Sequence, residues 1–444
     1  MPAFYIDQHG CAKNQVDGEE ISARLIDAGF SASASPEDAD IIIVNTCGFI
    51  EEAKKESIAA IVDIKRRWPE KKVIAAGCLS QRYSDALFSD LPEADGVFGN
   101  GDLSLIPEAV EKIARGAERI LLAIPQQRVM PPTYYPRTTF FDFPGTAHIK
   151  ITEGCSNHCS YCAIPSIRGE LRSRRSEDVV AEARALIDKG IFELVLIGQD
   201  LGNYGKDIAG RCMLPDLLTS LAGLRGNFRV RVLYIHPDHF PYEILPIIKE
   251  DSRFSPYFDL PFQHASTAVL RNMGRRGSAE RYLELIGRIR AELPLSMIRS
   301  TFLVGFPGET EADFAALLDF QKAAQLDWLG TFSYSREENT PAYSMKYRVS
   351  KATAQKRKTL VEEMQVAITA ERLRRFIGTK DHFIVEETFD HDELCIGRGW
   401  MQAPEVDGVT LIGAARKPGT IVEARITSVN GVDFGAALEY TATP

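Results

Sequence analysis

The sequence has no long apolar run, and its first residues do not have the pattern of a secretory signal. No stretch of its 444 residues approaches the roughly eighteen consecutive apolar residues that a membrane-spanning helix needs. The first ten residues, MPAFYIDQHG, have neither the basic region nor the apolar core of a secretory signal. These two absences argue against a membrane protein and against a secreted one. We therefore expect a cytoplasmic protein with no membrane partner.

An excess of positive charge is also absent. The formal net charge is -9 at pH 7, which is the wrong sign for a protein that binds nucleic-acid backbones over a broad surface. A dense basic run, RGELRSRR at residues 168–175, follows a cysteine-rich loop. This run is either a solvated charged segment or a local binding patch, and the sequence leaves both interpretations open.

The composition excludes several classes of protein. Hydrophobic residues make up 45% of the chain and charged residues 25%, which are ordinary values for globular proteins. Disordered, collagen-like and coiled-coil proteins are therefore excluded. A chain of 444 residues is too long for one ordinary hydrophobic core, so we expect two or three domains.

Short apolar runs alternate with amphipathic stretches near the N-terminus. The runs AFYID, DIIIVNT and KKVIAAG have the pattern of strands, and residues 17–28 and 49–67 have the pattern of helices. This alternation predicts a parallel sheet with both faces covered. We assign residues 1–125 to an N-terminal α/β domain.

The rest of the chain predicts two further domains. Residues 126–145 contain four prolines and no periodicity, so we expect a linker there. Six strand patterns separated by helical ones within residues 146–376 predict a partial (β/α)6 barrel of the TIM type. Its active site should lie at the carboxyl ends of the strands. Five short strand patterns in residues 377–444 predict a small antiparallel β-barrel of OB-like size, which we interpret as a substrate-docking domain.

Three of the eight cysteines lie within the segment EGCSNHCSYC. In a reducing cytosol this spacing favours metal ligation over disulfides. Cys155, Cys159 and Cys162 fall short of the four ligands of structural zinc, although His158 is the alternative fourth ligand. A four-iron, four-sulfur (4Fe-4S) cluster with three thiolate ligands keeps one iron open, and chemistry occurs at an open iron. Tyr161 offers an aromatic face to a planar ligand beside such a cluster.

A second set of three cysteines is spread along the N-terminal domain. Cys11, Cys47 and Cys78 each follow a predicted strand, in the turn before a helix. The carboxyl ends of neighbouring parallel strands lie side by side, and open sheets bind their ligands there. We therefore expect one shared site, with a buried core cysteine as the alternative for each residue. Cys212 and Cys395 match no motif and are interpreted as structural.

The segment GCSNHCSYC after a barrel strand resembles the radical S-adenosylmethionine (SAM) superfamily. The resemblance implies that the open iron chelates the amino and carboxylate groups of SAM. It also implies that the reduced cluster cleaves SAM to a 5'-deoxyadenosyl radical. IGQD at residues 197–200 and FLVGFPGET at residues 302–310 match the places where this superfamily contacts SAM. Gln199 and Tyr161 are the candidate SAM contacts.

The segments GCAKNQVDGE, NTCGFIEEAKKES and AAGCLSQRY resemble the methylthiotransferase family within this superfamily. That resemblance implies that Cys11, Cys47 and Cys78 bind a second, auxiliary 4Fe-4S cluster. CAIPSIRGELRSR and MQAPEVDGVTLIG resemble the ribosomal-protein branch, the RimO family, whose C-terminal barrel is a TRAM domain. The implied reaction adds a methylthio group to the β-carbon of an aspartate in the twelfth small-subunit ribosomal protein. One SAM is the radical source and another is the methyl donor.

The charge of the C-terminal domain bears on the substrate. Residues 377–444 carry five Lys and Arg against eleven Asp and Glu, a net charge of -6. An RNA-binding barrel should be basic, whereas basic ribosomal proteins, free or within the ribosome, are attracted to an acidic surface. A tRNA adenosine methylthiotransferase is the alternative, and a non-enzymatic iron-sulfur RNA-binding protein is a more distant one. The expected redox partner is a low-potential electron donor such as a flavodoxin or ferredoxin.

Overall fold

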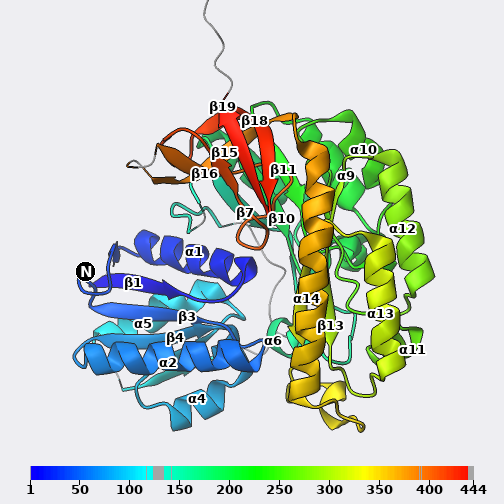
Figure 1. Ribbon diagram of the computed structural model, residues 1–444. Helices are drawn as coiled ribbons and strands as arrows, with labels where there is room; N and C mark the ends of the chain where they lie inside the picture. Colours follow the sequence, from blue (N-terminus) through cyan, green and yellow to red (C-terminus); the bar gives the residue numbers. More distant parts are fainter. Residues whose placement is uncertain are drawn as a thin grey trace, which may run out of the picture.

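The computed structural model describes residues 2–116, 118–123, 135–141, 143–389, 391 and 393–438. Three units follow one another along the chain: an α/β domain, an open barrel and a small closed barrel (Figure 1). None of the helices in these ranges is long and apolar enough to cross a membrane. The part of the expected linker before residue 135 lies outside the described residues.

Six parallel strands form the N-terminal sheet, in the spatial order β2 (Ser31–Ala32), β1 (Ala3–Gln8), β3 (Ile41–Thr46), β4 (Lys72–Gly77), β5 (Gly96–Gly99) and β6 (Ile120–Leu122). The helices are α1 (Ala12–Asp27), α2 (Glu51–Arg67), α3 (Cys78–Arg82), α4 (Ser84–Asp90) and α5 (Ile106–Ala114). β3 is buried along its whole length, as its apolar run predicts for a central parallel strand. Ile41 and Ile43 pack with α1 and α5, whereas Ile42 and Val44 pack with α2 and α4. The predicted parallel sheet with two covered faces is confirmed.

The second unit is an open barrel of parallel strands. One sheet contains β11 (Arg229–Val232), β10 (Glu193–Ile197) and β7 (Thr146–Lys150), and the other contains β12 (Tyr257–Asp259), β13 (Met297–Val304) and β14 (Trp328–Ser333). The two sheets meet through a bridge between Val230 and Phe254. Leucines of the outer helices, such as Leu217 and Leu317, pack against the strands in one core. The predicted partial barrel is confirmed.

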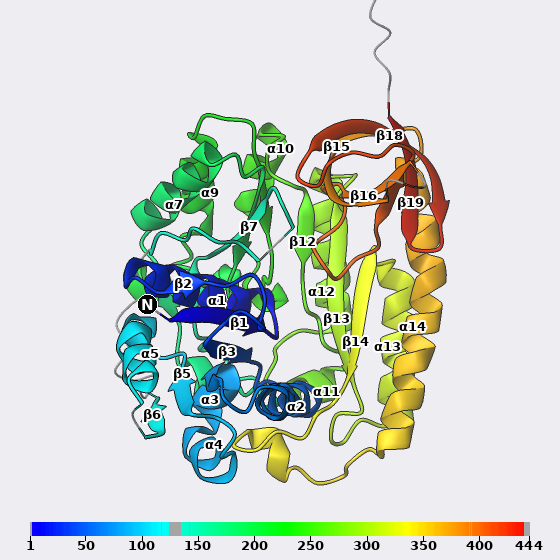
Figure 2. The same ribbon diagram turned by 90° about the vertical axis from the view of Figure 1, so that its left-hand side faces the viewer.

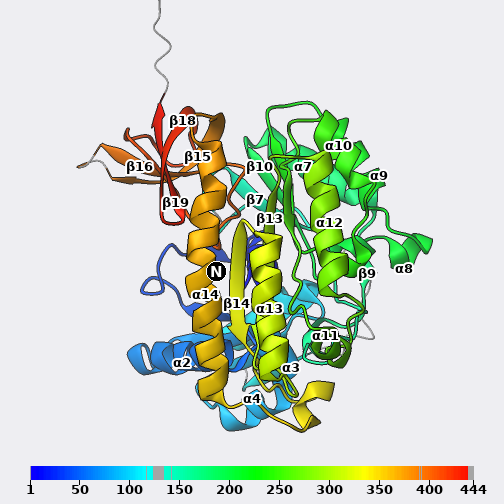
Figure 3. The same ribbon diagram turned by 45° about the vertical axis from the view of Figure 1, so that its right-hand side comes forward.

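The barrel unit also contains nine α-helices and two short strands among the described residues. The longer helices are α7 (Ser176–Asp188), α9 (Leu214–Ala222), α10 (Ile244–Glu250), α12 (Ala279–Glu292), α13 (Glu311–Ala324) and α14 (Lys351–Leu373). The shorter elements are α6 (Ile164–Arg168), α8 (Lys206–Ala209), α11 (Thr267–Asn272), β8 (Thr152–Glu153) and β9 (Arg172–Ser173). α14 runs along the outer side of the barrel and leads into the C-terminal unit (Figure 3).

Five strands close into the C-terminal barrel, in the order β15 (Lys380–Phe389), β16 (Leu394–Arg398), β17 (Thr410–Ile412), β19 (Asp433–Leu438) and β18 (Ile421–Asn430). The predicted small barrel is confirmed, but it is mixed rather than wholly antiparallel. β17 and β19 are parallel, and the other neighbours are antiparallel. Strand directions cannot alternate all the way round a closed ring with an odd number of strands. At least one neighbouring pair must therefore be parallel.

The C-terminal barrel packs against the amino ends of the open-barrel strands (Figure 2). Glu193, the first residue of β10, pairs with Arg231 at 2.8 Å and also with Arg398 of β16. These three side chains are buried. Arg229, the first residue of β11, pairs with Asp381 at 3.2 Å. Buried ion pairs with this geometry fix the C-terminal domain to the barrel, so it is not a loosely tethered appendage.

The N-terminal domain lies beside the carboxyl ends of the barrel strands (Figure 2). α1 contacts β7, and α3 contacts α6. Arg137, in the segment that joins these two units, is buried. It pairs with Glu182 of α7 at 2.5 Å and with Glu19 of α1. A single guanidinium group therefore joins a helix of each unit. The open barrel is held between the two other domains.

We expect Glu193→Gln to destabilise the protein by about 3–5 kcal/mol, because two buried guanidinium groups would lose their carboxylate. The readout is the melting temperature of anaerobically purified protein. Glu250→Gln, at the exposed end of α10, is the matched control and should change stability by no more than about 0.5 kcal/mol. An unchanged melting temperature for Glu193→Gln would show that these pairs do not secure the C-terminal domain.

Acid should weaken the same ion pairs. Burial alone raises the pKa of Glu193, but the charges of Arg231 and Arg398 outweigh burial and lower the pKa to about 2. A carboxyl group with a lowered pKa stabilises the folded state above its unfolded pKa, about 4.3. That contribution is lost as the pH falls from there towards about 2. We expect the melting temperature to drop across this range, and to drop less in Glu193→Gln.

Candidate active site

Cys11, Cys47 and Cys78 lie at one edge of the N-terminal sheet. Each follows one of the neighbouring strands β1, β3 and β4. The distance from Gly10 to Cys47 shows how closely the segments after β1 and β3 approach each other. A Cβ on this glycine would lie 3.0 Å from Cβ and 3.4 Å from Sγ of Cys47, and its φ of 91° favours glycine. The fold thus gathers three thiols that are far apart in the sequence.

Arg168 connects this first trio of cysteines with the barrel. Its Nη2 lies 3.1 Å from Sγ of Cys78 and 2.8 Å from the carboxylate of Asp17, and its Nη1 lies 2.8 Å from Glu153. Burial raises the pKa of Cys78 to about 12, and the charge of Arg168 opposes that rise. Cys11 is exposed; partial desolvation of its thiol raises the pKa, but the charges of Lys13 and Arg168 outweigh this and the pKa is lowered. The site therefore supplies positive charge beside its thiols.

Cys155, Cys159 and Cys162 lie in the loop after β8. The turn into this loop needs Gly154, because a Cβ there would lie 2.0 Å from the carbonyl oxygen of Glu170. The amide of Cys162 donates to the carbonyl of Cys159 at 3.0 Å, which curls the loop back on itself. Burial raises the pKa of Cys155 to about 11 and that of Cys162 to about 12. These thiols form the second trio.

A buried carboxylate holds the second trio's loop from the side. Asp200 Oδ2 accepts hydrogen bonds from Asn157 at 2.8 Å and from Asn203 at 2.9 Å, and it lies 2.9 Å from Nδ1 of His239. Asn157 belongs to the cysteine loop, and Asp200 follows β10. Sequence reasoning missed this role, although Asp200 closes the segment IGQD. The position of Asp200 at the end of this segment was the only signal for its role in the sequence.

The two predicted SAM contacts differ in their surroundings. Both polar atoms of the Gln199 amide are buried with no hydrogen-bond partner among the described residues. Buried amides are normally paired, so a polar ligand here would satisfy Gln199. Tyr161 packs edge-on against Phe306, with ring centroids 6.4 Å apart, and hydrogen-bonds with Arg275. The role of each in SAM binding stays a prediction.

The segment FLVGFPGET forms the end of β13 and the turn that follows it. The Glu309 carboxylate accepts hydrogen bonds from the amides of Gly305 and Phe306, and it pairs with Arg357 at 3.1 Å. Gly305 has a φ of 77°, and a Cβ there would lie 2.4 Å from Cβ of Ala354. The turn at the carboxyl end of β13 is therefore fixed by contacts within the protein.

The donors fit iron-sulfur clusters. Each trio offers three thiols, and a 4Fe-4S cluster bound by three thiolates keeps one iron open for a further ligand. The unpaired amide of Gln199 and the cations Arg168 and Arg275 suit an anionic cluster with a bound polar ligand. Within the described ranges, no group of three His, Cys, Asp or Glu side chains is close enough to hold a single metal ion.

Two of the four arginines in the basic run RGELRSRR form ion pairs in the interior of the protein. Arg168 and Arg174 are buried. Arg168 is paired as described above, and Arg174 pairs with Glu182 at 2.6 Å. Arg175 is exposed and pairs with a carboxylate of α7 at 3.2 Å. Internal ion pairing of half the arginines argues against a nucleic-acid-binding patch here.

Lys13 and Tyr234 lie where the first trio faces the barrel. Lys13 is two residues after Cys11, and its Nζ lies 3.3 Å from the carbonyl oxygen of Gly198 and 3.4 Å from the ring centroid of Tyr234. Tyr234 has a φ of 62°, which is rare for a bulky residue and is often found at functional sites. Sequence reasoning missed both residues. The position of Lys13 beside Cys11 was the only signal.

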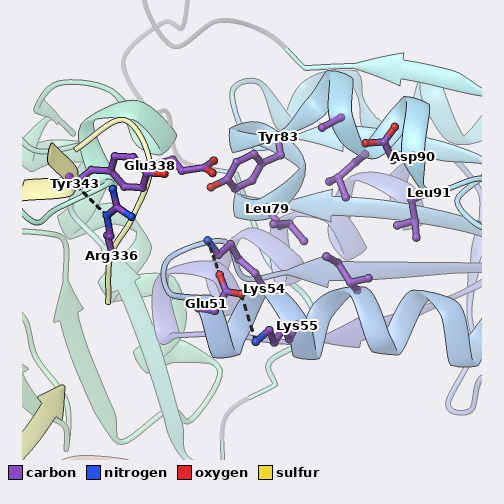
Figure 4. Close-up of a pocket in the computed structure, with 13 residues that line it drawn as sticks. Glu51, Lys54, Lys55, Leu79, Tyr83, Asp90, Leu91, Arg336, Glu338 and Tyr343 are labelled. Atoms are coloured by element: carbon purple, nitrogen blue, oxygen red, sulfur yellow. Dashed lines mark hydrogen bonds and ion pairs between the residues drawn. The ribbon is translucent and has the colours of Figure 1, made fainter. Parts of the chain in front are cut away.

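A separate cavity of about 550 Å³ lies between the N-terminal domain and the segment after β14 (Figure 4). On one side of it, Lys54 and Lys55 pair with Glu51. On the other, the Arg336 guanidinium lies 3.8 Å from the ring centroid of Tyr343. None of the predicted cluster or SAM residues is among the described residues that line this cavity. The two cysteine trios therefore remain the candidate site.

Three family models match successive parts of the chain. Residues 3–99 match the Uncharacterized protein family UPF0004, residues 149–320 match the Radical SAM superfamily, and residues 377–438 match the TRAM domain. The first match contains the first cysteine trio. The second contains the other trio and Gln199.

Several relatives that match nearly the whole chain share one name. The ribosomal protein uS12 methylthiotransferase RimO of Treponema denticola is 44% identical over 97% of this chain and 99% of its own length. The protein of the same name from Geobacter sulfurreducens is 41% identical over 96% of each chain. Among solved structures, the radical S-adenosylmethionine methyltransferase TsrM from Kitasatospora setae has a TM-score of 0.56 at 16% identity, covering 77% of this chain and 74% of its own. That structural likeness concerns the fold alone.

We expect Asp200→Asn to loosen the loop that carries the second cysteine trio, because a charged acceptor shared by Asn157, Asn203 and His239 would be lost. Amide hydrogen exchange of residues 155–162 should become roughly tenfold faster or more. Asp216→Asn, an exposed carboxylate that pairs only at the surface with Arg211, is the control. Unchanged exchange in Asp200→Asn would show that the loop is held by its backbone contacts instead.

Proposed function

Because the chain belongs to the RimO family of radical SAM methylthiotransferases, we propose that it adds a methylthio group to the β-carbon of an aspartate in ribosomal protein uS12. The observation that carries the proposal is the pair of cysteine trios connected through Arg168. A chain with this pair matches the Treponema denticola RimO over 99% of that protein's length. The two sites supply what a sulfur insertion at a carbon-hydrogen bond requires.

Each trio is assigned one cluster. Members of the radical SAM superfamily use a 4Fe-4S cluster with SAM, and we assign that cluster to the second trio and an auxiliary 4Fe-4S cluster to the first. When bound, the clusters and two molecules of SAM supply the radical, the sulfur and the methyl group. The proposed ligands of the SAM-binding cluster are Cys155, Cys159 and Cys162. Those of the auxiliary cluster are Cys11, Cys47 and Cys78.

The remaining residues position these groups. Arg168 lies six residues after Cys162 and contacts Cys78, so it keeps the two sets of ligands at a fixed separation. The amide of Gln199 is available to a polar group of SAM. Tyr161 packs beside the second trio. Fixed placement of the reacting groups away from water is the main contribution that a protein makes to such chemistry.

Charge supports a protein substrate over tRNA. The C-terminal domain carries a net charge of -6, and half the arginines of the basic run are in internal ion pairs. Binding of tRNA would require free cations along the phosphate backbone. A basic ribosomal protein, in contrast, is attracted to an acidic surface.

Reduction of the second trio's cluster requires an external electron donor. We propose a low-potential carrier such as a flavodoxin or ferredoxin. Ser156 and His158 are the exposed residues of the cysteine loop. This exposed edge is where the donor would approach the cluster.

Cysteine variants separate the roles of the two trios. We expect Cys159→Ala to abolish SAM cleavage, whereas Cys47→Ala should lose about four of about eight irons per chain and still cleave SAM. Cys47→Ala should form no methylthiolated product. Cys212→Ala is the control, because this cysteine belongs to neither trio. Methylthiolated product from Cys47→Ala would refute the auxiliary-cluster assignment.

A product assay tests the substrate. The reduced enzyme is incubated with SAM and either uS12 or tRNA, and each product is analysed by mass spectrometry. We expect a methylthio group in place of one hydrogen on a uS12 aspartate and no change in tRNA. Methylthiolated adenosine in tRNA with unmodified uS12 would favour the alternative substrate.

A further inference from the structure

The cations of the barrel and of its boundary with the first trio differ in their partners. Three of them each pair with two carboxylates: Lys150 and Arg168 with Asp17 and Glu153, and Arg299 with Asp259 and Asp407. Lys13 differs from these three. Its Nζ contacts the carbonyl of Gly198 and the ring of Tyr234, and it has no carboxylate within ion-pair distance in the described part of the chain.

The position of Lys13 is locally unfavourable. It is the second residue of α1, so its cation lies at the end of the helix where the peptide dipoles favour negative charge. The first turn of α1 contains no acidic residue to compensate. A cation partly removed from water without a counterion is also costly. The thiol of Cys11 is nearby, but no carboxylate of the described residues pairs with Lys13, so the site has room for an anion from outside the chain.

The surroundings of Lys13 indicate where that anion lies. Lys13 is two residues from Cys11, a proposed ligand of the auxiliary cluster. Its Nζ contacts the carbonyl of Gly198, which precedes the proposed SAM contact Gln199. A carbon that loses hydrogen on the SAM side and gains sulfur on the auxiliary side must lie between these two points. The carboxylate of an aspartate is one bond from its β-carbon and would fall within this space.

Tyr234 fixes the direction of the ammonium group. Its backbone is in the left-handed region, and its carbonyl oxygen accepts a hydrogen bond from the amide of Leu201 at 2.9 Å. This conformation places the ring under Nζ of Lys13, where the cation interacts with the ring face. The contact holds the ammonium in place but gives it no carboxylate partner.

We propose that Lys13 binds the side-chain carboxylate of the target aspartate, with Tyr234 holding the ammonium group in position. This inference rests on the proposed function, since it assigns a residue to the substrate of that reaction. Lys13 thereby selects an acidic side chain and sets where its β-carbon lies. The competing role is neutralisation of the thiolates of the first trio, and the experiment separates the two.

The test compares full-length Lys13→Met, Lys13→Arg and wild type on uS12. Lys13→Met should lower kcat/KM roughly 10- to 100-fold, mainly through a higher KM, because a charged hydrogen bond to the substrate is lost. Lys13→Arg should recover part of that loss because it keeps the charge. Lys112→Met, an exposed lysine of α5 that pairs only with Glu108, is the control. Iron content and the electron paramagnetic resonance spectrum of Lys13→Met should match those of wild type.

A uS12 variant with asparagine at the target position isolates the carboxylate. Used as a competitive inhibitor, it should bind Lys13→Met and wild type equally, because it has no charge for Lys13 to recognise. The inference would be overturned if Lys13→Met bound the aspartate and asparagine forms of uS12 equally more weakly than wild type does. Loss of iron in Lys13→Met, or an unchanged kcat/KM, would also overturn it. Wild-type enzyme that leaves uS12 unmodified would overturn the proposed function as well. If wild type modifies uS12 normally and any of the other results is obtained, only the inference about Lys13 is overturned and the proposed function stands.

Discussion

Buried ion pairs between the N-terminal domain and the barrel are the constraint on which the rest of the structure depends. Arg168 contacts Asp17, Glu153 and Cys78 at once, and Lys150 pairs with the same two carboxylates. Charges away from water interact strongly only in good geometry, so such a network tolerates little displacement. Two sets of thiols that belong to different domains are therefore kept in one arrangement.

The same principle applies at the other end of the barrel. Glu193 is shared by Arg231 and Arg398, which joins the amino ends of the strands to the C-terminal barrel. The open barrel is thus clamped on two sides by networks that each use residues from two domains. Large relative motions of the domains would break several buried pairs together.

Much of the architecture could be predicted from the sequence. Apolar runs such as IIIV in β3 and the repeated strand and helix patterns locate both α/β units, and the position of Cys11, Cys47 and Cys78 after successive strands predicts that the fold gathers them. These features depend on local periodicity and on general rules of parallel sheets.

The remaining features depend on contacts between distant segments. The partners of Arg168 include residues 151 and 90 positions away, and no local pattern shows whether an arginine in a basic run turns inward. The strained backbone of Tyr234 and the two unpaired amide atoms of Gln199 likewise arise only when the strands are assembled. The parallel pair in the C-terminal barrel follows from closure of the ring, which strand patterns alone do not indicate.

The open barrel leaves β7 at the end of its sheet, and α1 of the N-terminal domain lies against this strand. All five residues of β7 are buried. A free terminal strand offers unpaired peptide groups to other chains and promotes aggregation. The N-terminal domain therefore also covers a sheet edge of the open barrel that would otherwise promote aggregation. A barrel expressed without that domain would expose this edge and tend to self-associate.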